Sequence, residues 1–436
     1  MKNMKKLFLL LSMAVLSAGN MKAYKTRTFT HDNEDYSINT LWINLEAVSD
    51  YYQKFYNGEV WLYSPFFFVK DDVIYMTKDA SATQSTSLMA IDGKSGNFKE
   101  IIPIDWGNFT PNSVAAVYGG VDSEGTCYVA SYGTSTSDKY PFIIYPLEFT
   151  AAGQPKVVGQ YKLEMGANWW IKSVEIHGSL MDGNFTVASL IWDKMQVGET
   201  ETLRSSIGMW QYSQYQLIAR KEYVQPLTVC DIFMVADDKI IVHDRHKVSN
   251  EEYSATAIAA TPSLFTIDEN GMNLHSAIDS SKDDDNFGNG IAVFTLGEDK
   301  HFMVYASSGL PVEFKLLALP DYPESLANAR IICTLTPKCV GLGIDAAKDD
   351  REKTGVFIEK KDDNTANIYV TGNKRGMAAY TIKREAPLNT GVESITTDEQ
   401  YPTEYYTVTG LQIPEKPSTG FYIEKRGTKT AKKFAK

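Results

Sequence analysis

The sequence has little cysteine for its size, with four residues in a chain of 436. So few cysteines do not make a disulfide scaffold. Cys127 and Cys230 lie in apolar, strand-like segments, and we expect both to be buried thiols. Cys333 and Cys339 could pair only if a turn at 336–337 reverses the chain, because an extended strand would hold them roughly 20 Å apart. The cysteine content therefore excludes a disulfide-rich fold.

The common catalytic motifs are also missing. The sequence contains no Gly-x-Ser-x-Gly elbow, no His-Glu-x-x-His pair and no Gly-x-x-x-x-Gly-Lys phosphate loop. The glycines of 341–346 match the loosest dinucleotide pattern, but that pattern works only where it joins a strand to a helix. No helix is expected nearby, so we interpret this segment as a tight turn and predict no cofactor. Whether the protein is an enzyme stays open, and these absences favour a non-catalytic one.

Two polar runs resemble metal-binding segments without completing one. His243-Asp244-Arg245-His246 has two imidazoles three residues apart, which point to opposite faces of a strand. Asp283-Asp284-Asp285-Asn286 supplies oxygen ligands but lacks the glycine and final glutamate of a calcium loop. We interpret the first as a hairpin edge and the second as a solvated loop. No metal site is predicted.

Acidic residues outnumber basic ones, and long apolar runs are scarce beyond the first residues. The formal net charge is -11, and such a surface repels phosphate backbones, which argues against nucleic acid as a partner. No later segment approaches the roughly 20 apolar residues of a transmembrane helix. We therefore expect a mature chain without a membrane span.

The N-terminus has the pattern of a secretory signal peptide. Lysines at positions 2, 5 and 6 precede the apolar run 7–16, and the small residues 17–19 follow it. Residues 1–23 are therefore predicted to be a signal peptide, with cleavage between Ala18 and Ala23. Asn20 stands where a lipoprotein would have cysteine. We expect an exported protein that is extracellular, at the cell surface or periplasmic.

A repeated unit is the most regular feature of the sequence. An acidic or glycine-bearing turn precedes a short apolar strand six times, and turn residues flanked by β-branched and aromatic residues are typical of hairpins. Each hairpin is followed by a further strand about 15 to 25 residues downstream. The acidic residues that mark these turns are Asp72, Glu124, Asp182, Asp238, Asp299 and Asp363. This spacing predicts a four-stranded unit with variable loops.

Units of this kind stack radially into a β-propeller, which leaves few exposed strand edges. The chain resembles bacterial secreted β-propeller proteins, through the Asp-Asp-x-Ile-Tyr hairpin at 71–75 and the strand and turn at 88–96. The predicted fold class is all-β, with a propeller of six or seven four-stranded blades over residues 24–385. Residues 24–54 are expected to supply a closing strand or part of a seventh blade. A pair of β-sandwich domains is the rival architecture.

The C-terminal end forms a separate pattern. Residues 386–400 are polar and carry Thr390 and Gly391, which is typical of a linker. The strand-like segments 405–413 and 420–423 and the terminal lysines follow. Residues 401–436 are similar to the C-terminal sorting domains of type IX secretion. The resemblance implies a small β-module that secretion machinery reads as an address. A module that merely packs on the propeller is the alternative.

Candidate binding residues come from the segments before the first strand of a unit, which gather around one mouth of a propeller channel. Three of these segments combine aromatic rings with amides. Flat rings stack on the C–H faces of sugars while amides bind hydroxyl groups. The alternative is that the rings are buried between blades. The candidates are Trp106, Asn108, Asn168, Trp169, Trp170, Asn286 and Phe287.

The leading functional hypothesis is a secreted or surface-displayed, non-catalytic protein that binds a glycan or protein ligand through its inter-blade loops. A carbohydrate-active hydrolase or lyase on the same scaffold is the first alternative, and a structural surface scaffold is the second. A channel with two close carboxylates would favour the enzyme. An aromatic pocket without such a pair would favour the binder, and a channel filled by apolar side chains would favour the scaffold.

Overall fold

The computed structural model describes the chain in segments, which belong to two compact units, Met1–Arg384 and Glu385–Lys436. The predicted signal peptide, 1–23, and linker, 386–400, lie outside the described residues. Within the described part, no helix is long and apolar enough to cross a membrane. The described residues are 26–44, 66–77, 86–111, 115–133, 141–197, 200–225, 227, 230–244, 261–279, 290–307, 313–336, 354–372, 376–385, 403–408, 411–426 and 429–435.

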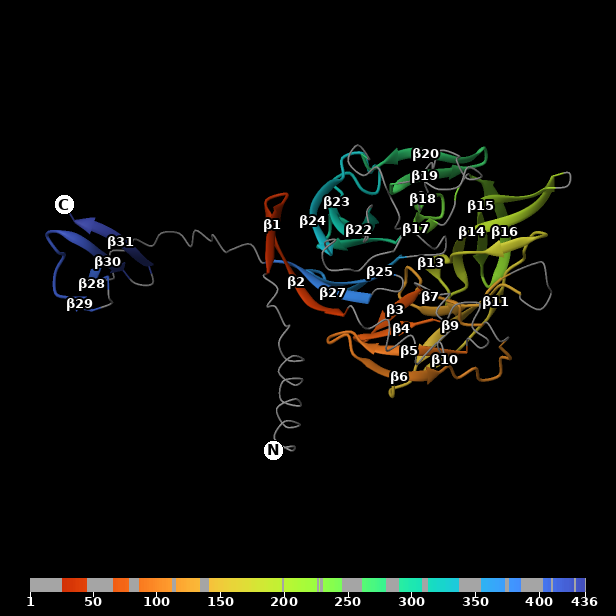
Figure 1. The fold of residues 1–436 in the computed structure, drawn as a ribbon, viewed down its shortest axis with the longest axis horizontal. Coiled ribbons are helices and arrows are strands. Elements are labelled where there is room, and N and C mark those ends of the chain that lie inside the picture. Colours follow the sequence, from red (N-terminus) through yellow and green to blue (C-terminus); the bar gives the residue numbers. More distant parts are fainter. Residues whose placement is uncertain are drawn as a thin grey trace, which may run out of the picture. The chain divides into compact units, whose positions relative to one another are not determined.

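The first unit contains six antiparallel sheets, which we number as blades in chain order. Figure 1 shows these sheets arranged around a common centre. Blade one has the strands β3 (Phe67–Lys70), β4 (Val73–Met76), β5 (Ser87–Asp92) and β6 (Phe98–Pro103). Blade two has the strands β7 (Tyr118–Val121), β8 (Cys127–Ala130), β9 (Ile143–Phe149), β10 (Pro155–Val157) and β11 (Tyr161–Lys162). Blade three has the strands β12 (Trp169–Ile171), β13 (Glu175–Ser179), β14 (Asn184–Val197), β15 (Thr200–Ser213) and β16 (Gln216–Val224).

The other three sheets repeat this arrangement. Blade four has the strands β17 (Cys230–Ala236), β18 (Lys239–Asp244), β19 (Ser263–Asp268) and β20 (Gly271–Ala277). Blade five has the strands β21 (Ile291–Leu296), β22 (Lys300–Ser307), β23 (Glu313–Ala318) and β24 (Arg330–Thr336). Blade six has the strands β25 (Thr354–Asp362), β26 (Thr365–Gly372), β27 (Gly376–Arg384), β2 (Glu34–Asn44) and β1 (Arg27–His31).

The repeats of the sequence correspond to the blades of the structure. Each of the six marker acids lies in or beside the turn that joins the innermost strand of a blade to its second strand. The downstream strands expected from the sequence are the third strands, from β5 in blade one to β27 in blade six. The prediction of a β-propeller is therefore confirmed, and the rival pair of β-sandwiches is wrong.

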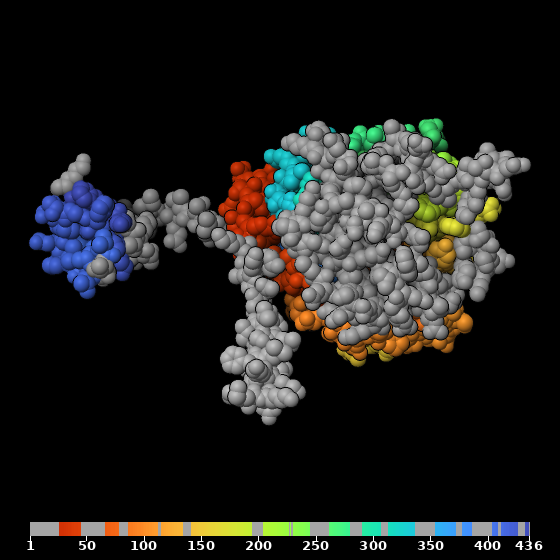
Figure 2. Space-filling model, in the orientation of Figure 1, coloured from red at the N-terminus to blue at the C-terminus, as the bar shows by residue number. Residues whose placement is uncertain are grey.

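The N-terminal segment closes the ring rather than forming a seventh blade. β2 pairs with β27, so blade six combines strands from both ends of the first unit. β1 lies against blade five, where Arg27 donates a hydrogen bond to the carbonyl oxygen of Thr334. Figure 2 shows this N-terminal hairpin in red beside blade five in cyan. The sequence predicts either a closing strand or part of a seventh blade for residues 24–54. The described residues 26–44 confirm the closing strand.

Among the described residues, the buried apolar side chains form six clusters, one at each interface between neighbouring blades. For example, Tyr75 of blade one and Val129 of blade two share a cluster, and Tyr369 of blade six shares another with Met89 of blade one. The remaining four clusters join blades two and three, three and four, four and five, and five and six. Burial of apolar surface between blades thus runs around the whole ring and stabilises it.

The second unit is a four-stranded antiparallel sheet. Its fully buried Tyr422 lies 5.9 Å from Tyr405, measured between ring centroids. Its strands are β28 (Thr403–Thr407), β29 (Gln412–Ile413), β30 (Gly420–Arg426) and β31 (Lys429–Ala435). The prediction of a small C-terminal β-module is confirmed.

The cysteines follow the sequence prediction where the structure describes them. Cys127 and Cys230 are buried, free thiols. Burial raises the pKa of the Cys127 thiol to about 12, which keeps it in the unreactive protonated form. Cys333 is also free, and its suggested partner Cys339 lies outside the described residues.

Candidate functional site

A cavity of about 520 Å³ lies at the centre of the propeller and is lined by the innermost strands of all six blades. Blades one to five are each four strands deep from the innermost to the outermost strand, so consecutive innermost strands begin at the same end of the ring. We call this end the mouth. The lining includes residues from both ends of these strands, such as Asp231 and Met234 of β17. The cavity is therefore a channel along the axis of the propeller.

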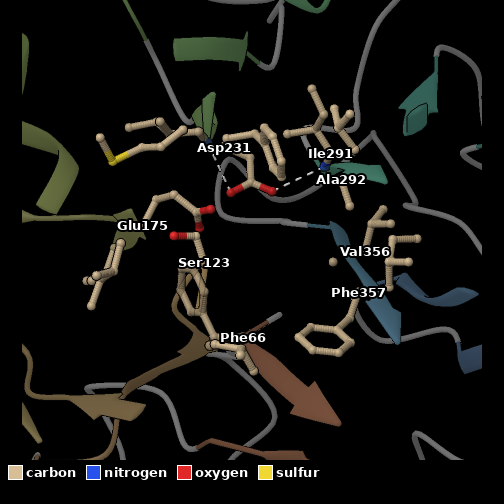
Figure 3. A pocket seen from close by; sticks show the side chains of 18 of the residues that line it. Phe66, Ser123, Glu175, Asp231, Ile291, Ala292, Val356 and Phe357 are labelled. Carbon is tan, nitrogen blue, oxygen red and sulfur yellow. Dashed lines mark hydrogen bonds between the residues drawn. The ribbon is translucent and has the colours of Figure 1, made fainter. Parts of the chain in front are cut away.

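Two carboxyl groups lie at the mouth of this channel. Glu175 begins β13, and Asp231 is the second residue of β17 in the neighbouring blade. Figure 3 shows both side chains directed into the cavity. Their closeness is reflected in the pKa of Glu175, which the negative charge of Asp231 helps to raise. The channel thus carries an acidic pair contributed by adjacent blades.

The two carboxyl groups are held differently. Asp231 accepts hydrogen bonds from the backbone N–H groups of Ile291, at 3.2 Å, and of Ile232, also at 3.2 Å. Backbone donors of this kind stabilise the ionised form of a carboxylate. Glu175 accepts a backbone hydrogen bond from Met234, which lowers its pKa, but burial and the charge of Asp231 outweigh this effect.

The pKa of Glu175 is consequently raised well above its ordinary value, first by burial and then by the charge of Asp231. Two carboxylates that share a site cannot both ionise at low cost, so the environment separates their roles. Glu175 favours the protonated form, which donates a hydrogen bond from its O–H. Asp231 is anchored by N–H donors and presents oxygen acceptors. The pair therefore offers a donor and an acceptor side by side.

Aromatic rings form much of the remaining channel wall. Phe66, Phe67 and Phe357 come from blades one and six, and Phe233 and Phe294 come from blades four and five. In Figure 3 the rings of Phe66 and Phe357 lie across the cavity from Asp231. The channel combines flat apolar faces with a few polar groups, as small-molecule sites commonly do.

Gly120 of blade two lines the channel and lies against a tyrosine of the neighbouring strand. A Cβ atom added to Gly120 would lie 2.7 Å from the hydroxyl oxygen of Tyr128. Tyr128 is fully buried, and its hydroxyl donates to the carbonyl oxygen of Val174 at 3.1 Å. Burial raises the pKa of this hydroxyl well above its ordinary value, so it remains a donor. Gly120 therefore leaves room for the Tyr128 side chain, whose hydroxyl links blade two to the start of blade three.

Among the residues that the structure describes, no group of three or more His, Cys, Asp or Glu side chains is arranged to hold a metal ion. His243 and Asp244 end β18 and are fully buried, and the His243 ring packs edge-on against Tyr305 at 5.5 Å. Arg245, His246 and the acidic run 283–286 lie outside the described residues.

Those candidate residues from the sequence that the structure describes lie apart from the channel lining. Trp106, between β6 and β7, packs edge-on against Tyr145 at 5.1 Å, and the nearby Asn108 is exposed. Asn168 is also exposed and has a left-handed φ of 62°. Asn286 and Phe287 lie outside the described residues.

The two adjacent tryptophans of blade three point in opposite directions. Trp169 is buried in the core between blades two and three, 6.1 Å from Trp210. Trp170 is partly exposed and lies directly opposite Trp192 on β14. The structure thus brings Trp170 together with Trp192, which the sequence did not single out, and separates both from Trp106.

Sequence reasoning missed the acidic pair, although the repeats contain a signal for it. Glu175 and Asp231 both stand seven residues before the marker acid of their own repeat. The corresponding positions of the other repeats hold Pro65, Val117, Ala292 and Val356. A carboxyl group at a position that is otherwise apolar, in two consecutive repeats, predicts an acidic pair on neighbouring innermost strands.

Comparisons with known proteins support the fold. No protein-family model matches the chain, and no curated protein matches it. The chain is similar to the structure of a DUF4623 family protein from Bacteroides eggerthii, with a TM-score of 0.52, 13% identity and 83% of each chain covered. This likeness shows the fold alone.

Two further structures are more distant. A protein of unknown function from Dyadobacter fermentans has a TM-score of 0.43 and 11% identity, over 75% of this chain and 96% of that one. A neuraminidase-like protein of A/little yellow-shouldered bat/Guatemala has a TM-score of 0.39 and 11% identity, over 75% of this chain and 99% of that one.

Proposed function

We propose that this protein is an exported carbohydrate-binding protein that takes a neutral sugar unit in the central channel of its propeller. The observation that carries the proposal is the Glu175–Asp231 pair at the channel mouth. A sugar hydroxyl both donates and accepts hydrogen bonds. A protonated Glu175 would donate to one hydroxyl while Asp231 accepts from another.

The walls and the size of the channel support the same ligand class. Phe66 and Phe357 offer flat apolar faces on which the C–H groups of a sugar ring can pack. The volume of about 520 Å³ lies within the range of small-molecule sites. An acidic pair in an open cavity also argues against a purely structural scaffold, whose channel would be filled by apolar side chains.

Binding would be tested by screening the full-length mature chain on a glycan array and by titration calorimetry with each glycan that binds. Glu175→Ala should weaken binding at least tenfold, because it removes a hydrogen-bonding group from the channel wall. Glu175→Gln should stay within a few fold of wild type, because the amide keeps a donor at the same place. Glu124→Ala is the matched control, since this exposed acid lies in a turn of blade two. Absence of binding to any glycan by the wild type would refute the proposal.

A second candidate is a carbohydrate hydrolase on the same site, which two close carboxyl groups in the channel favour. Binding stands first because the channel also has the aromatic wall expected of a binder. The observation that favours it is the raised pKa of Glu175 beside Asp231, because glycosidases pair a protonated carboxylic acid with an ionised carboxylate. Glu175→Gln separates the two candidates, since the amide binds sugars but cannot give up a proton to a leaving group. Release of reducing ends by the wild type and its loss in Glu175→Gln would favour the hydrolase. Binding without turnover would favour the binder.

Export forms the other part of the proposal. Residues 1–23 have the pattern of a signal peptide, and residues 401–436 are similar to type IX sorting domains. We propose that the C-terminal module is read by secretion machinery. Deletion of 401–436 should leave the protein in the periplasm of a host that has this machinery, as cell fractionation and blotting would measure. Surface display that survives the deletion would contradict this role.

A further inference from the structure

The sheet of blade three extends past the mouth of the channel. β14 and β15 each have 14 residues, whereas the innermost strand β13 has five. β13 pairs with the first part of β14, and β12 then pairs with β14 further along the same edge. The hairpin of β14 and β15, edged by β12, therefore rises from the end of the ring at which Glu175 lies.

One face of this extension continues from the acidic pair. Glu175 lies directly opposite Ala188 on β14, and Trp170 lies directly opposite Trp192. Directly opposite residues of an antiparallel pair share a face, and so do residues an even number of positions apart on one strand. Ala188 and Trp192 are four positions apart, which corresponds to about 13 Å along the strand. Glu175 and the two tryptophans thus lie along one face.

A lysine completes the cluster at the outer end of this face. The Nζ atom of Lys172 lies 4.3 Å from the ring centroid of Trp192 and 5.2 Å from that of Trp170. The backbone N–H of Lys172 donates to the carbonyl oxygen of Leu190 at 2.8 Å, which fixes its position on the sheet. The two indole rings and Lys172 are each partly exposed. Attraction between the ammonium group and both rings holds the charge in place.

We propose that Trp170, Trp192 and Lys172 form an outer sugar subsite, so that the protein recognises an oligosaccharide with one unit in the channel and a later unit on this cluster. The inference rests on the proposed function, because it assumes that the channel binds a sugar. The indoles supply the apolar faces that a sugar ring needs, and Lys172 supplies hydrogen-bond donors for its hydroxyl groups. The distance of about 13 Å along the strand requires a ligand longer than one sugar ring.

The neighbouring tryptophan takes no part in this subsite. Trp169 lies on the opposite face of β12, where it packs in the core between blades two and three. Its ring is only 4% exposed. Of the two adjacent candidates from the sequence, the subsite therefore contains Trp170 alone.

The test is calorimetric titration of the full-length mature chain with glucose, mannose and xylose and with their β-1,4-linked tetrasaccharides. The wild type should bind one tetrasaccharide at least tenfold more tightly than the matching monosaccharide. Trp170→Ala should weaken tetrasaccharide binding by about threefold to tenfold and leave monosaccharide binding unchanged. Lys172→Ala should have a smaller effect in the same direction. Trp170 belongs to none of the hydrophobic clusters, so its substitution should leave the fold intact.

Tyr215→Ala is the matched control, because this aromatic residue is 61% exposed and lies in the turn between β15 and β16 of the same blade. Tyr215→Ala should change neither the affinity for the monosaccharide nor the affinity for the tetrasaccharide. Equal affinity for monosaccharide and tetrasaccharide, or a tetrasaccharide affinity that survives Trp170→Ala, would overturn the subsite and leave the proposed function standing. If the wild type bound none of the six sugars, both the outer subsite and the proposed sugar-binding function would be overturned for this ligand class.

Discussion

Trp42 of β2 donates its indole N–H to the carbonyl oxygen of Gly93, at 2.7 Å, in the turn between β5 and β6. This bond joins the N-terminal strand of blade six to blade one. The ring is 8% exposed and packs in the cluster shared by these two blades. A Cβ atom added to Gly96 would lie 2.6 Å from the ring, so the turn of blade one fits closely against it. Trp42 therefore makes a long-range contact that helps to close the propeller.

Trp42→Ala should lower the free energy of unfolding of the propeller by about 3 to 5 kcal/mol, because it removes a buried ring and its hydrogen bond. Trp42→Phe keeps much of the apolar contact and should cost about 1 to 2 kcal/mol. Urea denaturation followed by tryptophan fluorescence and circular dichroism would measure both. Leu41→Ala is the control, since its side chain is 40% exposed on the same strand. Equal losses for Leu41→Ala and Trp42→Ala would contradict this role of the indole.

A charged cluster strengthens the same closure at the turn of blade one. Asp72 lies 2.5 Å from the Nζ atom of Lys361 in blade six and 2.8 Å from that of Lys94. The bond with Lys361 is the main reason that the pKa of Asp72 lies below its ordinary value. Because the pKa of Asp72 is lower in the folded state than the unfolded value of 3.8, the ionised carboxylate stabilises the fold at pH values above 3.8. This contribution is lost as the pH falls through the folded pKa.

Asp72→Asn should therefore cost less than about 1 kcal/mol at pH 7, because the cluster is partly exposed and solvent screens it. The asparagine tolerates the left-handed φ of 60° at this position, so the loss reflects charge and not backbone strain. The cost should shrink in 1 M NaCl, and it should be lost as the pH falls below 3.8 and through the folded pKa. Denaturation midpoints at both salt concentrations would measure it, and a cost that salt does not change would argue against an electrostatic origin.

The propeller could be predicted from the sequence because its signals are local. The marker acids from Asp72 to Asp363 recur with each blade, and each turn is encoded by residues next to one another. The contact between Trp42 and Gly93 has no such local signal, since it joins segments from different blades. The sequence thus indicated a closing strand without indicating how it is held.

Less of the candidate site could be predicted. Alternation along a strand implies that Trp169 and Trp170 point to opposite faces, but only the packing decides that Trp169 is the buried one. The partner of Trp170, Trp192, lies on a strand whose length of 14 residues had no sequence signal. Glu175 and Asp231 were within reach, because they occupy the same position of consecutive repeats.

Gly120 offers a test of the channel wall. Gly120→Ala should lower the free energy of unfolding by about 1 to 3 kcal/mol, because the new methyl group would collide with the buried Tyr128 hydroxyl 2.7 Å away. Gly159→Ala is the matched control. The nearest atom to its added Cβ would be a Pro146 carbon at 3.7 Å, which is ordinary contact. Thermal or urea denaturation would compare the two variants, and equal stability would show that blade two has room for a methyl group beside Tyr128.

Glu175 gives the propeller a characteristic dependence on pH. Its folded pKa is raised well above the ordinary value of 4.5, so between these two values the folded state binds more protons than the unfolded state. The protonated group is compatible with the fold below pH 4.5, and stability falls as the pH rises from there toward the folded pKa. The slope should be at most about 1.4 kcal/mol per pH unit over this interval.

Glu175→Gln replaces the acid by a neutral amide and should remove this slope. The variant should therefore match the wild type near pH 4.5 and become progressively more stable than it as the pH rises. Asp231→Asn should have a partial effect, because it removes the charge that helps to raise the pKa of Glu175 and leaves the burial unchanged. Urea denaturation of the three proteins at half-unit steps from pH 4 to 9 would measure the differences, with Asp182→Asn in an exposed turn as the control. Parallel stability curves for wild type and Glu175→Gln would mean that Glu175 ionises with an ordinary pKa, and the donor role proposed for it in sugar binding would then fail as well.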